Sequence, residues 1–250
     1  QTLRIITELE NRYYEFNGLN LTFETIDGLV KHNGPVIDLT KYNKILGKNF
    51  FKNKIKFLNN TSLEAQIASI SDDIAYNSHD LEDGLKSNLF KLDDLNGISL
   101  LNKIISKHKK KIKKYSIDLI VRQIIRDIIN EMVRDVIKTT KKNIKINHIK
   151  NLKDVYKSSK PIVSFSNKMK MFDIEIKNFL KQKMYFHKTV NENTEHGRKI
   201  IKNLFLVIKK NPKKYIDIRK YKHFTLERII CDYIAGMTDR YAINLYKKIK

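Results

Sequence analysis

The sequence predicts an all-α fold, and two observations support that prediction. Apolar residues recur at helical spacing in several long stretches, of which SIDLIVRQIIRDIINEMVRDVIKTT at residues 116–140 is the clearest. No segment shows the strict apolar–polar alternation or the β-branched hairpin pattern that is typical of a sheet. With 250 residues, of which 41% are hydrophobic, the chain has enough apolar side chains for a sizeable core.

Helices are expected along most of the chain, joined by polar stretches that contain the breaks. Residues 36–60 and 141–168 have no clear period and are predicted to be loops or connectors, and another loop is expected at Pro212. The predicted helical segments are residues 1–16, 22–32, 61–84, 85–105, 116–140, 169–187, 188–210 and 224–248. Residues 85–105 should form short helices rather than one long helix.

The segment Thr61–Gly84 has the most complete set of helix signals. Thr61 and Glu64 match a capping box, in which the hydroxyl and the carboxylate each accept a backbone N–H of the first turn. Gly84 stands where a helix is expected to stop, because glycine adopts the left-handed conformation at little cost. No Pro or Gly interrupts the residues between them. We therefore predict one long central helix with these two ends.

The second half of this central helix carries a polar stripe. Successive residues of a helix are rotated by about 100°. With this rotation, Asp72, Tyr76, His79 and Asp83 fall in one narrow stripe, and Asp80 lies just beside it. Apolar residues flank the stripe, so we expect the helix to be largely buried. Burying carboxylates costs several kcal/mol unless a metal, a cation or hydrogen bonds compensate. The alternative is a solvated acidic face.

The net charge is +23, from 50 Lys and Arg against 27 Asp and Glu. Such an excess attracts polyanions such as nucleic acid or nucleotides. The chain is also rich in Lys, Asn, Ile, Tyr and Phe, which have AT-rich codons, so genome composition explains part of the excess. The densest cluster, Lys107–Lys114, is expected to be an exposed loop or helix face rather than a phosphate-binding patch.

Several classes of protein are excluded or disfavoured. The single cysteine, Cys231, rules out an internal disulfide and any zinc site built on several cysteines. No apolar run approaches the roughly 20 residues of a membrane span, and no signal peptide is present, so we expect a cytoplasmic protein without a membrane partner. Glycine-rich phosphate loops, the dinucleotide fingerprint and the Gly-x-Ser-x-Gly elbow are absent.

Four stretches together resemble one known family. They are LTFETIDGLVKHNGP (Leu21–Pro35), SLEAQIASISDDIAYNSHDLEDGL (Ser62–Leu85), RIICDYIAGMTDRYA (Arg228–Ala242) and the opening QTLRIITELE. The sequence is similar in these stretches to the deoxyguanosinetriphosphate triphosphohydrolase-like family of the HD superfamily. The matching stretches are long and are spread over nearly the whole chain.

The resemblance implies an HD-type helical bundle that cleaves a deoxynucleoside triphosphate, such as dGTP, to the deoxynucleoside and inorganic triphosphate. It further implies that Asp72 is a ligand of a divalent metal ion such as Mg²⁺ or Mn²⁺, since Asp72 opens the family pattern Asp-x-x-x-Tyr-x-x-x-Asp. By the same pattern, Tyr76 and Asp80 contact the deoxyribose. Lys183 is the nearest match to the basic residues with which the family contacts phosphate.

The family's His and His-Asp metal motifs should precede Gln1, and the sequence does not contain them. We therefore expect residues 1–250 to be the C-terminal portion of one HD-type domain that is incomplete at its N-terminus, with weak or no activity alone. The alternative is a non-catalytic nucleotide- or nucleic-acid-binding protein that uses Lys107–Lys114 and the face of Arg122, Arg126 and Arg134. Binding of single-stranded DNA and self-association are left open.

Overall fold

The computed structural model describes residues 1–250 except 37, 39, 47–59, 112–113, 218–223 and 250. The described residues form helices and no β-strand, apart from one isolated bridge between Asn11 and Gly18, so the predicted all-α class is confirmed. None of the described helices is both long and apolar enough to cross a membrane. The chain divides into two compact units, Gln1–Leu180 and Lys181–Lys250. The assignment of all 250 residues to one domain stays a prediction.

The first helix is much shorter than predicted. α1 (Thr2–Arg4) runs into a π-helical turn, η1 (Ile5–Leu9), and the backbone is already extended at Glu10. The amide of Gly18 donates to the carbonyl of Glu10 at 2.7 Å, so the chain returns to the end of η1. Gly18 has a φ of +76°, and a side chain there would overlap the η1 backbone. The predicted helix over residues 1–16 is wrong beyond η1, because this loop occupies the place of the next turn.

α2 (Phe23–Val30) begins where the sequence predicts. Its N-cap is Thr22, whose hydroxyl accepts a hydrogen bond from the amide of Thr25 at 3.3 Å. α2 ends at Val30, two residues before the predicted end, in a turn that leads into Asn33–Pro35. The local signals were sufficient here because the capping residue has no competing tertiary contact in the described residues.

α3 (Thr40–Leu46) lies in the stretch 36–60 that the sequence predicts as a loop, so that prediction is wrong for these residues. Residues 47–59 of the same stretch lie outside the described part of the chain. Of the α3 side chains that the structure describes, Tyr42 and Ile45 pack against a hydrophobic cluster, and a helix of seven residues is too short to produce a visible period. The buried residues of that cluster are Leu3, Ile26 and Val30.

α4 (Leu63–Lys86) is the predicted central helix, but its N-cap differs from the prediction. The N-cap is Ser62, whose hydroxyl accepts a hydrogen bond from the amide of Ala65 at 3.3 Å. The Thr61 hydroxyl instead donates to Oδ2 of the buried Asp27 on α2 at 3.1 Å. A tertiary contact thus takes the residue that the capping-box pattern assigned to the helix end.

The C-terminal end of α4 also differs from the prediction. The helix continues through Gly84 to Lys86, and the residue in the left-handed region is Asn88, with a φ of +53°. Gly84 is buried, and a Cβ atom at this position would overlap the ring of Phe90. Glycine is needed at position 84 because the ring lies directly on the helix backbone, not because the chain turns there.

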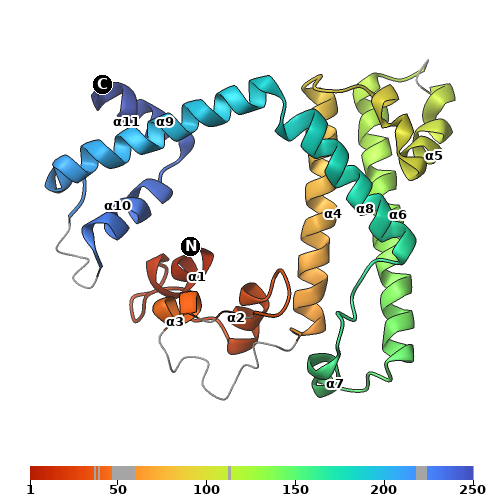
Figure 1. The fold of residues 1–250 in the computed structure, drawn as a ribbon, viewed down its shortest axis with the longest axis horizontal. Coiled ribbons are helices and arrows are strands. Elements are labelled where there is room, and N and C mark those ends of the chain that lie inside the picture. Colours follow the sequence, from red (N-terminus) through yellow and green to blue (C-terminus); the bar gives the residue numbers. More distant parts are fainter. Residues whose placement is uncertain (37, 39, 47–59, 112–113, 218–223, 250) are drawn as a thin grey trace. The chain divides into compact units, whose positions relative to one another are not determined.

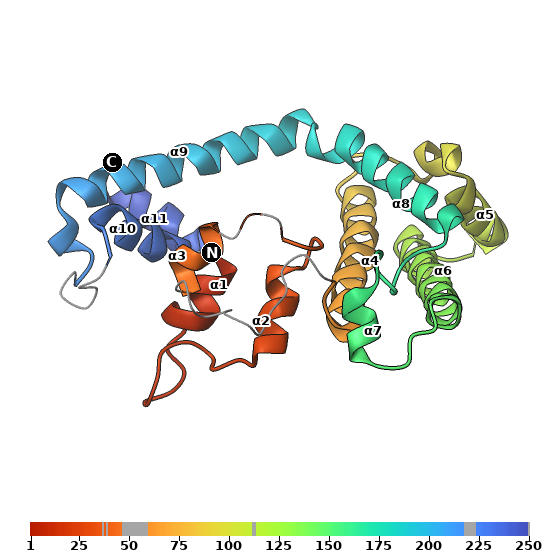
Figure 2. The same ribbon diagram turned by 60° about the horizontal axis from the view of Figure 1, so that its bottom comes forward.

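The remaining helices of the first unit surround α4. α6 (Ile117–Ile146) packs beside it, as Figures 1 and 2 both show, and α5 (Ser99–His108) packs on α6. α8 (Asn167–Leu180) packs against α4. The short helices predicted after α4 are present as η2 (Leu92–Gly97) and α5.

α6 confirms the predicted amphipathic pattern and extends it. Its apolar side is buried at Ile120, Ile124, Ile128 and Met132, whereas Val133, which continues the apolar spacing, is 39% exposed. The helix continues to residue 146, and α7 (Leu152–Lys157) follows within the predicted connector. The polar composition of residues 141–168 concealed these turns, because only one side of each contacts the protein.

A buried histidine ties α5 to α6. His108, the last residue of α5, is 5% exposed, and its Nε2 donates to Oδ2 of Asp127 at 2.9 Å. Burial acts to raise the pKa of Asp127, but its hydrogen bonds with His108 and Gln123 outweigh this effect and lower the pKa below the ordinary value. His108 therefore serves as a structural partner at the start of the lysine cluster.

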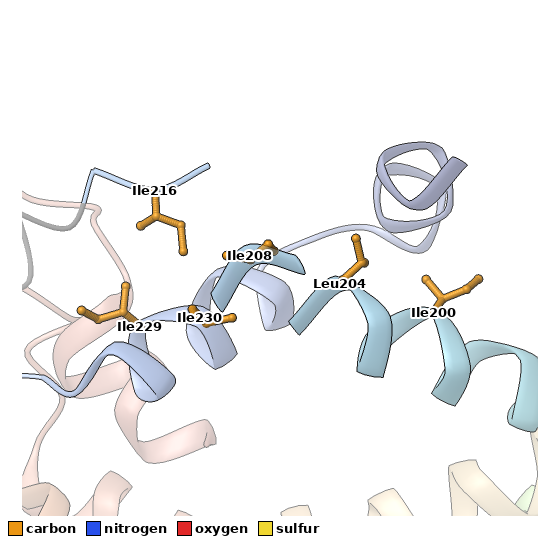
Figure 3. Packing of buried hydrophobic residues seen from close by; sticks show 6 residues of the cluster. All are labelled: Ile200, Leu204, Ile208, Ile216, Ile229 and Ile230. Atoms are coloured by element: carbon orange, nitrogen blue, oxygen red, sulfur yellow. The ribbon is translucent and has the colours of Figure 1, made fainter. Parts of the chain in front are cut away.

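The second unit consists of η4 (Lys181–Tyr185), α9 (Lys188–Lys210), η5 (Pro212–Lys214), α10 (Leu226–Ala235) and α11 (Asp239–Ile249). Both α10 and α11 pack on α9. Figure 3 shows the buried apolar residues that α9, α10 and the segment after η5 contribute, namely Ile200, Leu204, Ile208, Ile216, Ile229 and Ile230.

The single last helix predicted over residues 224–248 is in fact two helices. α10 ends at Gly236, whose amide donates to the carbonyl of Asp232 at 3.0 Å. α11 begins after Thr238, whose hydroxyl accepts from the amide of Tyr241 at 3.2 Å. Gly236 ends one helix and Thr238 caps the next. This boundary was missed because the apolar spacing continues across it.

Replacement of Gly84 by alanine should lower the free energy of unfolding by about 1–3 kcal/mol, because the added methyl group must displace the Phe90 ring. Gly197 in α9 is the matched control, since nothing lies within 4 Å of a Cβ there. Gly197→Ala should stabilise the protein by roughly 0.5–1 kcal/mol through helix propensity. Urea unfolding of both variants checks the sign, and equal effects would contradict the tight contact.

The contribution of Asp127 to stability should depend on pH. Its pKa is lowered on folding, so its stabilising effect is present above the unfolded pKa and is lost as pH falls through the folded value. The stability difference between wild type and Asp127→Asn should therefore be constant near neutral pH and shrink below about pH 4. Thermal unfolding across pH 2–7 measures it; a difference that grows on acidification would exclude this explanation.

A candidate functional site on helix α4

The three residues Asp72, Tyr76 and Asp80, here called the predicted row, share one side of α4. They are spaced by four residues and so follow one another along the same helix face. The Asp72 side chain is 71% exposed and Tyr76 is 57% exposed, while Asp80 is half-buried. His79 and Asp83, the other members of the predicted stripe, are exposed. The row and its neighbours therefore line an open face, and the expectation that this stripe points inward is wrong for the described residues.

The buried face of α4 carries a different set of side chains. Ile74, Asn77, Ser78 and Leu81 are buried, and two of these four are polar. Periodicity correctly grouped the row on one face, but it did not indicate that Asn77 and Ser78 are the covered polar residues. The true covered face mixes apolar residues with amide and hydroxyl groups, so hydropathy gave no clear contrast between the two sides.

Asp72 has a histidine beside it. Nε2 of His32, in the turn after α2, lies 3.4 Å from Oδ2 of Asp72. The His32 side chain is 43% exposed, so the pair sits at the surface. His32 lies 40 positions before Asp72 in the sequence, so no local pattern indicated this contact.

Four residues join α4 to α8 next to the row, and we call them the polar cluster. Nδ2 of Asn77 donates to Oδ1 of Asp173 at 2.6 Å. Nζ of Lys177 donates to Oδ2 of Asp173 at 2.9 Å and to Oδ1 of Asp73 at 3.1 Å. Burial acts to lower the pKa of Lys177, but these hydrogen bonds outweigh it and raise the pKa above the ordinary value. None of these four residues could be identified as a site residue from the sequence pattern.

A second buried polar side chain, Gln66, holds the segment that precedes α8. Its Oε1 accepts from the amides of Ile162 and Val163 at 2.9 and 3.0 Å, and its Nε2 donates to the carbonyl of Thr61 at 2.9 Å. All of the polar atoms of this 8%-exposed side chain are thus used. Gln66 fixes the path of residues 158–167 relative to α4.

A cavity of about 900 Å³ lies where this segment faces α4. Its lining includes His32, which contacts Asp72, and Asp73, which directly follows Asp72 in the sequence. Most of the other polar groups are amides and hydroxyls, such as Asn60, Asn143 and Ser164. The volume is within the usual range for small-molecule sites. The cavity adjoins the predicted row without containing it.

The described residues do not form a complete divalent-metal centre. They contain no group of three or more His, Cys, Asp or Glu side chains that could hold an ion together. Asp72 and His32 supply two donors at most, whereas a catalytic zinc site uses three protein ligands and Mg²⁺ prefers several oxygen ligands. The assignment of Asp72 as a metal ligand stays a prediction.

The basic residues singled out in the sequence are exposed. Lys183 lies on η4 in the second unit, and its side chain is exposed. Arg122, Arg126 and Arg134 are exposed on α6, as their place on the polar side of the helix predicts. In the lysine cluster Lys107–Lys114, the described lysines are exposed, and residues 112–113 lie outside the described part.

Comparison with known proteins identifies the family. Residues 163–248 match the model of the phosphohydrolase-associated domain. The whole chain is 52% identical to a deoxyguanosinetriphosphate triphosphohydrolase-like protein of Pelagibacter ubique and covers 67% of that protein. The chain belongs to the deoxyguanosinetriphosphate triphosphohydrolase-like family. Its all-α structure fits the HD-type helical fold that the sequence resemblance predicts.

More distant relatives agree with this assignment. The chain is 39% identical to a protein of the same description from Bartonella quintana and 37% identical to one from Caulobacter vibrioides. It covers 64% and 65% of these two proteins, respectively. The chain thus spans about two thirds of the length of these members of the triphosphohydrolase-like family.

Replacement of Gln66 by methionine should destabilise the protein by about 2–4 kcal/mol, because it leaves two buried backbone amides without an acceptor. Gln123→Met is the matched control, since Gln123 bonds only to side chains at the partly exposed surface of α6. It should cost less than about 1 kcal/mol. Chemical unfolding gives both values, and a Gln66 effect no larger than the control would show that the segment is held by other contacts.

Proposed function

We propose that this chain takes part in the hydrolysis of a deoxynucleoside triphosphate to a deoxynucleoside and inorganic triphosphate. One observation carries the proposal: in a member of the triphosphohydrolase-like family, Asp72, Tyr76 and Asp80 lie at four-residue spacing on one open face of a helix. A carboxylate, a phenol and a second carboxylate in this arrangement can contact a sugar and a phosphate group along about 12 Å of helix.

In the proposed reaction, water attacks the α-phosphorus and the bond between that phosphorus and the 5′-oxygen breaks. The water oxygen forms the new P–O bond and stays on the inorganic triphosphate. One proton passes to the 5′-oxygen, which leaves with the deoxynucleoside. Tyr76 and Asp80 orient the deoxyribose by hydrogen bonds to its hydroxyl group. On the sequence resemblance alone, Lys183 is proposed to supply positive charge to the phosphates, and its side chain is exposed in the second unit.

Asp72 is proposed to contribute one ligand to a divalent ion, the further ligands coming from outside the described residues. The two donors at this point of the chain cannot hold a catalytic ion alone. An ion completed in this way would offset the like charges of Asp72 and Asp80. The substrate is proposed to resemble dGTP, because the relatives are named for the hydrolysis of that nucleotide.

Replacement of Asp72 by asparagine should lower the rate of triphosphate release by about 100-fold or more, because it weakens the proposed metal ligand while preserving shape. The stability should change by less than about 1 kcal/mol, since the pair with His32 is exposed. The assay is ion chromatography of inorganic triphosphate from each of the four deoxynucleoside triphosphates, with Mg²⁺ or Mn²⁺, using the full-length protein.

Asp93→Asn is the control for this substitution, because Asp93 is an exposed carboxylate on η2 away from the predicted row. It should leave the rate unchanged. Full activity in Asp72→Asn would refute the proposed ligand role, whereas an inactive wild type with every nucleotide and both ions would refute the proposed function itself.

A further inference from the structure

Two members of the polar cluster, Asp73 and Asn77, lie on α4 directly beside the predicted row. The other two, Asp173 and Lys177, lie on α8. Asp73 directly follows Asp72, and Asn77 directly follows Tyr76. The first pair lies about one helical turn before the second pair. Because neighbouring residues of a helix differ by about 100° in direction, the row and these two cluster residues follow parallel lines on α4 that are about 100° apart. Any rotation or slide of α4 that displaces one row displaces the other by the same amount, because the helix backbone connects them rigidly.

The cluster contacts α8 in a way that restricts both of these motions. Each helix contributes two side chains at four-residue spacing, Asp73 and Asn77 from α4 and Asp173 and Lys177 from α8. Lys177 bridges Asp73 and Asp173, and Asp173 in turn accepts from Asn77, so the contacts form a continuous chain across the interface. Apolar contacts tolerate small shifts, whereas hydrogen bonds of 2.6–3.1 Å lose most of their energy when displaced by a helical step.

The central members of the cluster are shielded from water. Asn77 is 1% exposed and Asp173 is 8% exposed. A carboxylate at this depth needs its partners, since removing one leaves a buried charge without compensation. The alternative placements of α4 on α8 are therefore disfavoured by unpaired polar groups, which is how buried polar contacts specify helix register in other helical assemblies.

We infer that Asn77, Asp173 and Lys177 are positioning residues for the proposed reaction. They act through α4: by fixing its rotation and register on α8, they keep the predicted row directed at the substrate. None of the three is assigned a contact with the substrate. The inference rests on the proposed function, because it assumes that Tyr76 and Asp80 contact the deoxyribose.

The test compares Lys177→Met with Lys177→Arg in the full-length protein. Methionine removes the bridging charge but keeps most of the side-chain volume, whereas arginine keeps both bridges within reach of the two carboxylates. Lys177→Met should raise the KM for the deoxynucleoside triphosphate about 10-fold or more and lower kcat as well, since a small misplacement affects both sugar and phosphate contacts. Lys177→Arg should restore KM to within about 3-fold of wild type.

Lys86→Met is the matched control. Lys86 lies on α4, whereas Lys177 lies on α8, but the two side chains are similarly exposed, at 41% and 43%, and Lys86 pairs with Glu82 of its own helix at 2.5 Å. It makes no bridge to α8 in the described residues, so its loss should leave KM and kcat unchanged. A merely structural loss in Lys177→Met would reduce the active fraction, which lowers the apparent kcat and leaves KM as in wild type.

Asp73→Asn is the second variant, in case Lys177→Met does not fold. Asp73 is 52% exposed, so this change weakens one bridge of Lys177 without leaving a buried charge, and it should raise KM in the same direction by a smaller factor. An unchanged KM in both variants, with an active wild type, would overturn the positioning inference alone. A wild type that releases no triphosphate would overturn the proposed function, and this inference with it.

Discussion

The packing of α4 is the constraint on which the rest of the first unit depends. This helix contacts α2, α6 and α8, and its covered face is held at two levels by buried amides. Gln66 binds the segment before α8 near the N-terminal end, and Asn77 binds α8 itself a few turns later. Burial of apolar surface brings these helices together, but it does not select one rotation of α4. The two amides favour the observed rotation, because rotating α4 would break the hydrogen bonds that Gln66 and Asn77 make here.

The sequence predicted the existence of the helices better than their ends and faces. The long periods at residues 61–84 and 116–140 identified α4 and α6, and the all-α class followed. The predicted helix ends were wrong where packing contacts compete with local signals. The Thr61 hydroxyl bonds to Asp27 rather than to its own helix, and the ring of Phe90 packs on the helix backbone at Gly84. Neither contact has any trace in the neighbouring residues, so propensity and capping rules alone could not find it.

The candidate site was predicted in part for a similar reason. Helical spacing showed that Asp72, Tyr76 and Asp80 share a face, and the structure agrees. Spacing cannot tell which face is covered when both carry polar groups, so the row was expected to be inward and is in fact open. The residues that support it, above all Asp173 and Lys177, lie about 100 positions away on α8, and no local pattern connects them to the row.

The openness of the row also bears on its charges. Carboxylates that are exposed to water keep most of their hydration, so Asp72 and Asp83 can share this face without a buried counter-charge. Covering that face would change the balance, because like charges removed from water repel one another strongly unless a cation lies between them. His32 already pairs with Asp72 at the edge of the face. A face that is stable when open and demands a cation when covered is suited to binding a metal together with an anionic substrate, which is the chemistry proposed for this family member.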